Sequence, residues 1–96
     1  MEAVIRTYSG KGAKELFDVL EKNKKDVETL MRSVSGFSEY SLIRTGDGGV
    51  SLTVCRDKTG IEESAQKAKD WIVKNAAEVG AAAPRVSEGS VILQLH

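Results

Sequence analysis

The single cysteine and the single histidine limit the chemistry that this sequence can support. Cys55 has no second cysteine with which to form an internal disulfide or half of a metal-binding pair. His96 is the last residue, and no histidine cluster is available for zinc or iron. A nucleophilic Cys55 would need a base or a positive neighbour to form the thiolate, and no histidine partner is suggested, so a small buried or interface residue is the preferred interpretation. We expect no metal and no cofactor.

Three other side chains are candidates for binding a small molecule. Trp71 could wall a pocket and stack on a flat ligand, and Tyr40 could point its hydroxyl into a pocket between helices and sheet. Arg44, on the same strand face as Tyr40, could pair with an acidic ligand. Each also has a simpler interpretation: a half-buried boundary residue, a tyrosine at the rim of the core, and a surface arginine at a strand end. The sequence leaves both interpretations open.

Composition and charge exclude several classes of partner. Fourteen Lys and Arg balance fourteen Asp and Glu, so no net field attracts nucleic acid or an anionic membrane. No segment approaches the ~20 apolar residues that cross a bilayer, and the N-terminus lacks the pattern of a secretory signal. The segment from Ser9 to Gly12 resembles an anion cradle in outline but is better explained as a strand-to-helix turn. One free thiol favours a cytoplasmic location.

Six elements are expected to position these residues. Gly36 should end the first helix, the glycines around Asp47 should form a tight hairpin, and the Thr59–Glu62 spacing should begin the second helix as a capping box. The expected strands span residues 3–8, 40–45, 50–55 and 86–95, and the expected helices span 13–34 and 60–76. The order βαββαβ predicts a ferredoxin-like α+β fold: one domain over residues 1–96, with a four-stranded antiparallel sheet and both helices on one face.

Alternation along the strands assigns their residues to two faces of the sheet. The uniformly apolar set is expected under the helices and comprises Ala3, Ile5, Tyr40, Leu42, Val50, Leu52, Val54, Val91, Leu93 and Leu95. The mixed set is expected on the open face and comprises Val4, Arg6, Tyr8, Ser41, Ile43, Ser51, Thr53, Cys55, Ile92, Gln94 and His96. A face with so little charge suggests a partner, and a second copy packed sheet against sheet is the economical one. The alternative is a monomer with a Ser/Thr-rich open face.

The element order, the Gly36–Phe37 junction, the hairpin strands and Asp57 before the second helix together resemble the dimeric α/β-barrel superfamily. Within it, the chain is most similar to the antibiotic-biosynthesis-monooxygenase-like proteins, over nearly its whole length. The resemblance implies a homodimer whose sheets pack into a barrel, with a ligand pocket in each subunit between helices and sheet.

The catalytic residues of that family have no counterparts in this chain. Members that oxidise polycyclic aromatics or degrade haem typically use an Asn near the first strand, a Trp at the end of the third and a His in the second helix. At those places this chain has Arg6, Thr7 and Tyr8; Val54, Cys55, Arg56 and Asp57; and Gln66 or Lys67. No functional residue is carried over, and haem degradation is disfavoured because the only histidine is terminal.

Two functions from different classes follow from this reasoning. The first is a homodimer with a pocket for an apolar or aromatic compound, lined by Tyr40, Arg44 and Trp71, that acts as a cofactor-independent monooxygenase-like enzyme. Its electron-rich substrate would itself activate oxygen, so few protein groups are required. The second is a non-catalytic dimeric binding or interaction module, which the absent Asn, Trp and His favour. RNA-recognition and metal-chaperone domains of this topology are disfavoured by the missing strand aromatics and the missing Cys-x-x-Cys.

Overall fold

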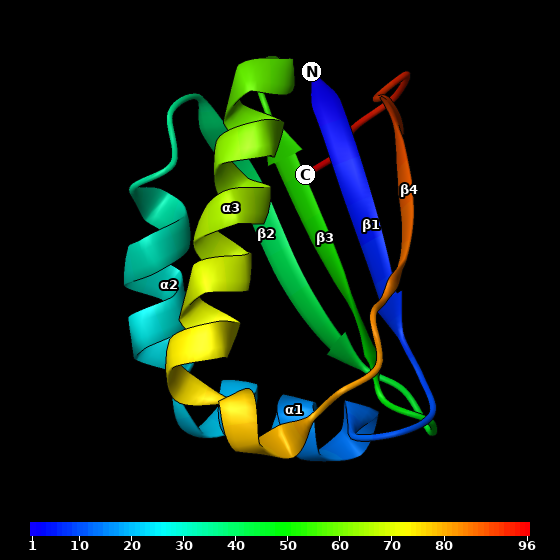
Figure 1. Ribbon diagram of the computed structural model, residues 1–96. Helices are drawn as coiled ribbons and strands as arrows, with labels where there is room; N and C mark the ends of the chain where they lie inside the picture. The colour runs from blue at the N-terminus through cyan, green and yellow to red at the C-terminus, as the bar shows by residue number, and fades with distance from the viewer.

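A four-stranded antiparallel sheet forms one layer of the structure, and its helices lie on one side of it (Figure 1). The computed structural model describes residues 1–96, and its sheet has the strand order β2-β3-β1-β4. The strands are β1 (Glu2–Tyr8), β2 (Phe37–Arg44), β3 (Gly49–Cys55) and β4 (Arg85–Ser90). The helices are α1 (Ala13–Lys22), α2 (Lys24–Arg32) and α3 (Lys58–Asn75), followed by the short 3-10 helix η1 (Ala77–Val79). This is the predicted ferredoxin-like α+β fold.

The predicted helix over residues 13–34 is two helices, broken at Asn23. The Asn23 side chain donates a hydrogen bond to the Val19 carbonyl oxygen at 2.7 Å, which competes with the helical pattern of the backbone. Figure 1 shows α1 lying across one end of the sheet and α2 running alongside it. The change of direction lets Leu16, Val27 and Met31 all remain buried. Gly36 ends this region with a φ of 70°, as its sequence position predicts.

The faces predicted for β1 and β3 are reversed in the structure. Val4, Thr53 and Cys55 lie on the helix side and are fully buried. Ile5, expected beneath the helices, lies on the open face and is 42% exposed. In β3 the more apolar face, Val50, Leu52 and Val54, turns away from the helices, so hydrophobicity alone predicts the wrong side. Steric fit accounts for the observed side: a Cβ atom at Gly49 would clash with the Phe17 ring, so the small residues on this face let the helices approach the sheet.

The faces predicted for the residues of β2 are confirmed, whereas the last strand is shorter than predicted. Tyr40 and Leu42 pack against the helix-side core. β4 ends at Ser90, and residues 91–96 leave the sheet edge as a tail that crosses one end of the open face (Figure 1). Gln94 anchors the tail by donating a hydrogen bond to Glu39 Oε1 at 2.8 Å. Val54 of β3, the strand between β1 and β2, lies at that end of the sheet and is only 3% exposed.

α3 begins two residues earlier than the predicted capping box, with a different N-cap residue. Asp57 is the N-cap, and its carboxylate accepts a hydrogen bond from the Gly60 backbone N–H at 3.2 Å. Thr59 lies inside the helix. Gly60 has no room for a Cβ atom, which would meet the Ser35 carbonyl oxygen and the Cys55 side chain. α3 therefore begins in close contact with the end of β3 and with the loop before β2.

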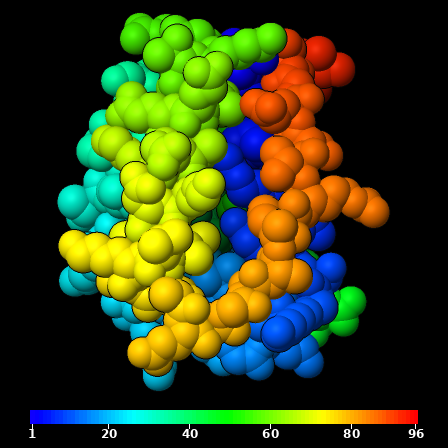
Figure 2. All heavy atoms as spheres, viewed as in Figure 1, coloured from blue at the N-terminus to red at the C-terminus, as the bar shows by residue number.

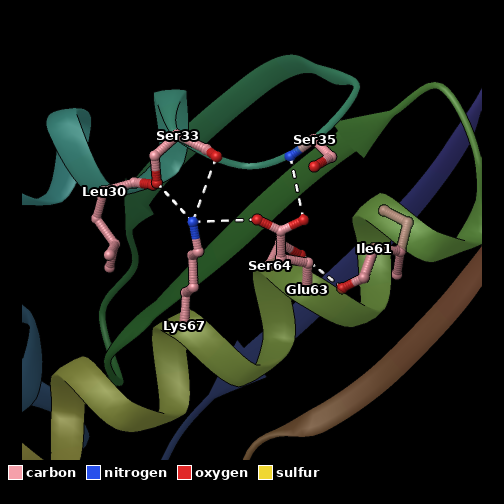
Figure 3. Close-up of polar contacts among 7 residues, drawn as sticks. All are labelled: Leu30, Ser33, Ser35, Ile61, Glu63, Ser64 and Lys67. Atoms are coloured by element: carbon pink, nitrogen blue, oxygen red, sulfur yellow. Dashed lines mark hydrogen bonds and ion pairs between the residues drawn. The ribbon is translucent and has the colours of Figure 1, made fainter.

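A polar cluster joins α3 to the end of α2 (Figure 3). Lys67 Nζ donates to Ser33 Oγ at 2.7 Å and pairs with Glu63 Oε2 at 3.1 Å. Glu63 Oε1 in turn accepts a hydrogen bond from the Ser35 backbone N–H at 3.3 Å. The hydrogen bond from Lys67, followed by those from Ser35, lowers the pKa of Glu63 below its ordinary 4.5. The cluster fixes the loop between α2 and β2 against α3.

No helix combines the length and the apolar character that crossing a bilayer requires.

The Glu63 cluster predicts a pH-dependent contribution to stability. Because folding lowers the Glu63 pKa, its carboxylate stabilises the protein above the unfolded-state value near 4.5, and this contribution is lost as the pH falls through the folded-state value. We expect Glu63→Gln to unfold at lower urea concentration than wild type at pH 7, with the two curves converging near pH 3. Glu62→Gln, at an exposed residue without an ion pair, is the control. A difference for Glu63→Gln that is the same at both pH values would contradict this role.

Candidate functional site

A groove of about 610 Å³ lies between α3 and the β1–β4 side of the sheet. Figure 2 shows it as a hollow between α3 and β4, with β1 visible at its base. The volume is within the range of small-molecule sites. Small side chains create this space, since five alanines line it: Ala65, Ala68, Ala81, Ala82 and Ala83.

The wall that α3 contributes to the groove is apolar. The residues of α3 that are buried against the rest of the protein are Gly60, Ile61, Ser64 and Trp71. Ala65 and Ile72 lie on the neighbouring stripe, are only partly buried and line the groove. Ile72 therefore packs against the core and also contributes, with Ala65, to the apolar wall of the groove.

The connector after η1 closes one end of the groove. The Ala82 backbone N–H donates to the Lys11 carbonyl oxygen at 2.9 Å, which ties the connector to the turn between β1 and α1. Gly12, in that turn, has a φ of 76° and faces the Ala81 backbone so closely that a Cβ atom would lie 2.7 Å from the Ala81 Cα. The segment from Ser9 to Gly12 is thus the predicted strand-to-helix turn, and it holds the groove wall in place.

The floor of the groove is β1, which presents Val4, Arg6 and Tyr8. Arg6 pairs across the sheet with Ser51 of β3 on one side and Val86 of β4 on the other, so its backbone is fixed from both directions. Its side chain is half-buried and is the only charged group on the floor. The other charged lining residues are exposed at the rim: Glu62, Lys69 and Glu88.

A second, much smaller cavity lies behind the groove. Its volume is about 20 Å³, enough for about one water molecule. Tyr40, Trp71 and Ser51 line it. Four residues border both spaces and separate them: Arg6, Tyr8, Ala68 and Ile72.

The two tyrosines near this boundary are hydrogen-bond donors at neutral pH. Burial, reinforced by the neighbouring Tyr8 and opposed by Arg6, raises the pKa of Tyr40 to about 12. Burial also raises the pKa of Tyr8, against the opposing charge of Arg6. Both phenols stay protonated, so neither is a general base at physiological pH.

The structure brings together two of the three predicted ligand-binding residues. Tyr40 and Trp71 face the same inner cavity, although Trp71 is only 8% exposed. Arg44 lies apart from them and lines neither the inner cavity nor the groove. It pairs with Asp18 at 3.1 Å and with Glu21 at 3.0 Å. A ligand role for these three residues stays a prediction, and for Arg44 the two ion pairs supply a structural alternative.

Arg6 and Tyr8 line the groove, although the sequence predicts both on the open face. An arginine and a tyrosine within a strand are also compatible with a solvated face, so no signal in the sequence distinguishes a groove from solvent.

The buried thiol and the acidic side chains supply no further centre. Cys55 is fully buried, and burial, with the nearby charges of Asp57 and Glu63, raises its pKa. The thiol form is therefore favoured over the reactive thiolate. No group of three or more His, Cys, Asp or Glu side chains is arranged to hold a metal ion.

Comparison with known proteins identifies the fold. The structure is similar to a protein of unknown function from Nitrosomonas europaea, NE2512, with a TM-score of 0.72 and 16% identity over 99% of this chain and 91% of that one. It is similar to the heme-degrader MhuD from Mycobacterium tuberculosis, solved with two hemes in its active site, with a TM-score of 0.69 and 20% identity over all of both chains. It also resembles a monooxygenase from the gene ActVA-Orf6 of Streptomyces coelicolor, in complex with nanaomycin D, with a TM-score of 0.67 and 14% identity over 99% of this chain and 89% of that one.

The predicted resemblance to the antibiotic-biosynthesis-monooxygenase-like proteins is confirmed at the level of the fold. No protein-family model and no curated protein matches the sequence. Structural likeness at this identity extends to the backbone and leaves the site residues to be argued from the chain itself.

The position of Trp71 predicts that this residue contributes to the stability of the fold, independently of any ligand. Its indole Nε1 donates a hydrogen bond to Asp26 Oδ2 at 2.7 Å, which ties α3 to α2. We expect Trp71→Phe to lower the free energy of unfolding by about 1–3 kcal/mol, because a hydrogen bond to a charged acceptor is lost. Asp26→Asn, which keeps an acceptor, should cost less. In urea denaturation, equal losses for Trp71→Phe in the wild-type and Asp26→Ala backgrounds would contradict the coupling.

Proposed function

We propose that the groove binds an apolar or aromatic small molecule and that the protein is a cofactor-independent monooxygenase-like enzyme. The observation that carries this proposal is the groove itself: about 610 Å³, walled by alanine, valine and isoleucine, with polar groups confined to the Arg6–Tyr8 floor and the rim. The structural likeness to a monooxygenase crystallised with nanaomycin D supports it. Tyr40 and Trp71 remain proposed ligand contacts, reached through the boundary that the inner cavity shares with the groove.

The proposed chemistry places most of the demand on the substrate. A phenol with a free ring position would give up a ring C–H and its O–H, take one oxygen atom of O₂ as a new carbonyl, and become a quinone. The second oxygen atom leaves as water with the two hydrogens, so phenol plus O₂ balances quinone plus water. The apolar walls would exclude bulk water, and the protonated phenols of Tyr8 and Tyr40 would act as hydrogen-bond donors.

The residues of the groove do not fit haem, the ligand of the structurally similar MhuD. Haem iron in proteins is usually held by His, Met, Cys or Tyr. None of the first three lines the groove, and His96 is exposed on the tail at the other face of the sheet. Tyr8 is the remaining donor, but its raised pKa disfavours the phenolate that would ligate iron.

We also propose a homodimer that forms through the open sheet face. The structure leaves Ile43 on this face 51% exposed, with Ile5 beside the half-buried Val50 and Leu52. Ile92, Leu93 and Leu95 of the tail are exposed as well. The face is more apolar than predicted, because the apolar sets of β1 and β3 lie on it. Two similar structures are described as dimeric ferredoxin-like proteins, at 10% and 19% identity. Exposed apolar area of this kind marks interaction surfaces.

The dimer proposal predicts that a charge on the open face separates the subunits. We expect Ile43→Glu to elute as a monomer under conditions in which the wild type is a dimer, as measured by size-exclusion chromatography with light scattering. Val73→Glu changes a valine on α3, at the groove, that is exposed to a similar or greater extent (63%), and should remain dimeric. Circular dichroism checks that both variants are folded. A monomeric wild type at micromolar concentration would contradict the proposal.

The enzymatic proposal predicts oxygen uptake that depends on the groove. We expect the wild type to consume one O₂ for each quinone formed from at least one member of a panel of polycyclic phenols and hydronaphthoquinones. Ala65→Phe, which fills the groove from α3, should lower the rate at least tenfold. Ala77→Phe, at an exposed residue outside the groove, should leave it unchanged.

The alternative function, a non-catalytic dimeric binding module, gives a different outcome in the same experiment. Compounds of the panel would bind to the wild type and lose affinity in Ala65→Phe, but no oxygen would be consumed. The absence of the family's Asn, Trp and His is the observation that favours this alternative. Failure of every compound to bind would contradict both functions.

A further inference from the structure

Arg6 is a cation without a protein partner at the floor of an apolar groove. The chain contains four ion pairs, and none involves Arg6. Its guanidinium also makes no side-chain hydrogen bond, although Arg32 and Arg44 both do. Arg56 and Arg85, which are likewise without ion pairs, are exposed to water. Arg6 alone combines partial burial with a free guanidinium.

The acidic residues of the groove do not neutralise Arg6. Glu62 of α3 and Glu88 of β4 line the groove, but both side chains are exposed at the rim and neither pairs with Arg6. Lys69 is also at the rim. Charges at the rim are screened by water and contribute little to the electrostatic potential inside the groove. A charge on the floor acts in a medium of lower dielectric constant. Arg6 therefore dominates the electrostatics where a ligand would be most enclosed.

We propose that Arg6 binds an acidic group of the ligand, so that the groove selects an aromatic or apolar molecule carrying a single carboxylate. This inference rests on the proposed function, since it names the class of ligand for the same groove. A guanidinium presents paired N–H donors that match the two oxygens of a carboxylate, and such bidentate pairs are among the strongest hydrogen bonds in proteins. The protonated Tyr8 phenol, next on the same strand face, supplies a further donor. The alanine and valine walls would hold the apolar body of the molecule.

The geometry of β1 makes Arg6 a selective contact and not merely an attractive one. Pairing with β3 and β4 fixes its backbone, so the side chain leaves the sheet from a fixed point on the groove floor. A neutral ligand of the same shape would fill the groove and leave the guanidinium partly desolvated without a partner. The free-energy cost of that desolvation weakens binding of the neutral analogue relative to the acid.

The test compares matched acids and amides. Binding of benzoate, 2-naphthoate and anthracene-2-carboxylate, and of the three corresponding amides, is measured by chemical-shift titration of ¹⁵N-labelled protein. We expect at least one acid to bind at least tenfold more tightly than its amide. Arg6→Gln should abolish this preference by weakening the acid while leaving the amide unchanged, and Arg6→Lys should retain part of it. Arg85→Gln, an exposed arginine of β4 whose partner Thr7 lies on the open face, is the charge-matched control.

The outcomes separate this inference from the proposed function. If acids and amides bind in the groove equally, or if Arg6→Gln keeps the preference for the acid, the groove is a binding site but the assignment of Arg6 is wrong. If no compound binds and no groove resonance shifts, the proposed function fails and this inference fails with it. Equal weakening of acid binding by Arg6→Gln and Arg85→Gln would indicate a general effect of net charge and would also overturn the assignment.

Discussion

The one-sided anchoring of α3 is the constraint on which the rest of the structure depends. Its polar contacts come from Glu63, Lys67 and Trp71, which are spaced four residues apart and so form one stripe along the helix. All three reach α2 or the loop that follows it. None of these contacts draws α3 toward β1 or β4, where its small residues Ala65 and Ala68 lie. Toward β1, the helix packs through Ile61 against Val4, and the groove is the space left beyond that contact, where small residues face β1 and β4.

The order of the elements was predictable from the sequence because local signals determine it. Gly36 adopts the left-handed conformation that its position suggests, and the glycines around Asp47 join two strands. The break at Asn23 was not predictable from periodicity, since the apolar spacing continues across it and only the side-chain bond to Val19 marks it. The N-cap was misplaced by two residues because Asp57 and Thr59 are both good caps. The fit of Gly60 against Ser35, a contact distant in sequence, favours Asp57.

The candidate site was harder to predict because it depends on which face of the sheet each strand presents. A one-residue change of parity moves every side chain of a strand to the other face, and in β3 the more apolar face is the one that turns away from the helices. Tyr40 was placed correctly because β2 has a clear difference between its two faces. Arg6 was missed for the opposite reason: an arginine suggests solvent, and the sequence contains nothing that announces a groove. Trp71 was found through its residue type, but its partner Asp26 is 45 positions away and had no local signal.

The two faces of β1 connect the two proposals physically. Ile5 and Arg6 are consecutive residues, so one side chain points to the open face and the next to the groove. A subunit packed against Ile5 would therefore lie directly behind the strand that carries Arg6, and would restrict the bending and twisting of that strand. In the monomer, β1 is held by its hydrogen bonds to β3 and β4 and, on the helix side only, by the packing of Val4 and Tyr8 in the core. Apolar burial on the open face would thus stiffen the floor of the groove without contributing a residue to it, and assembly and ligand selection would share a single strand.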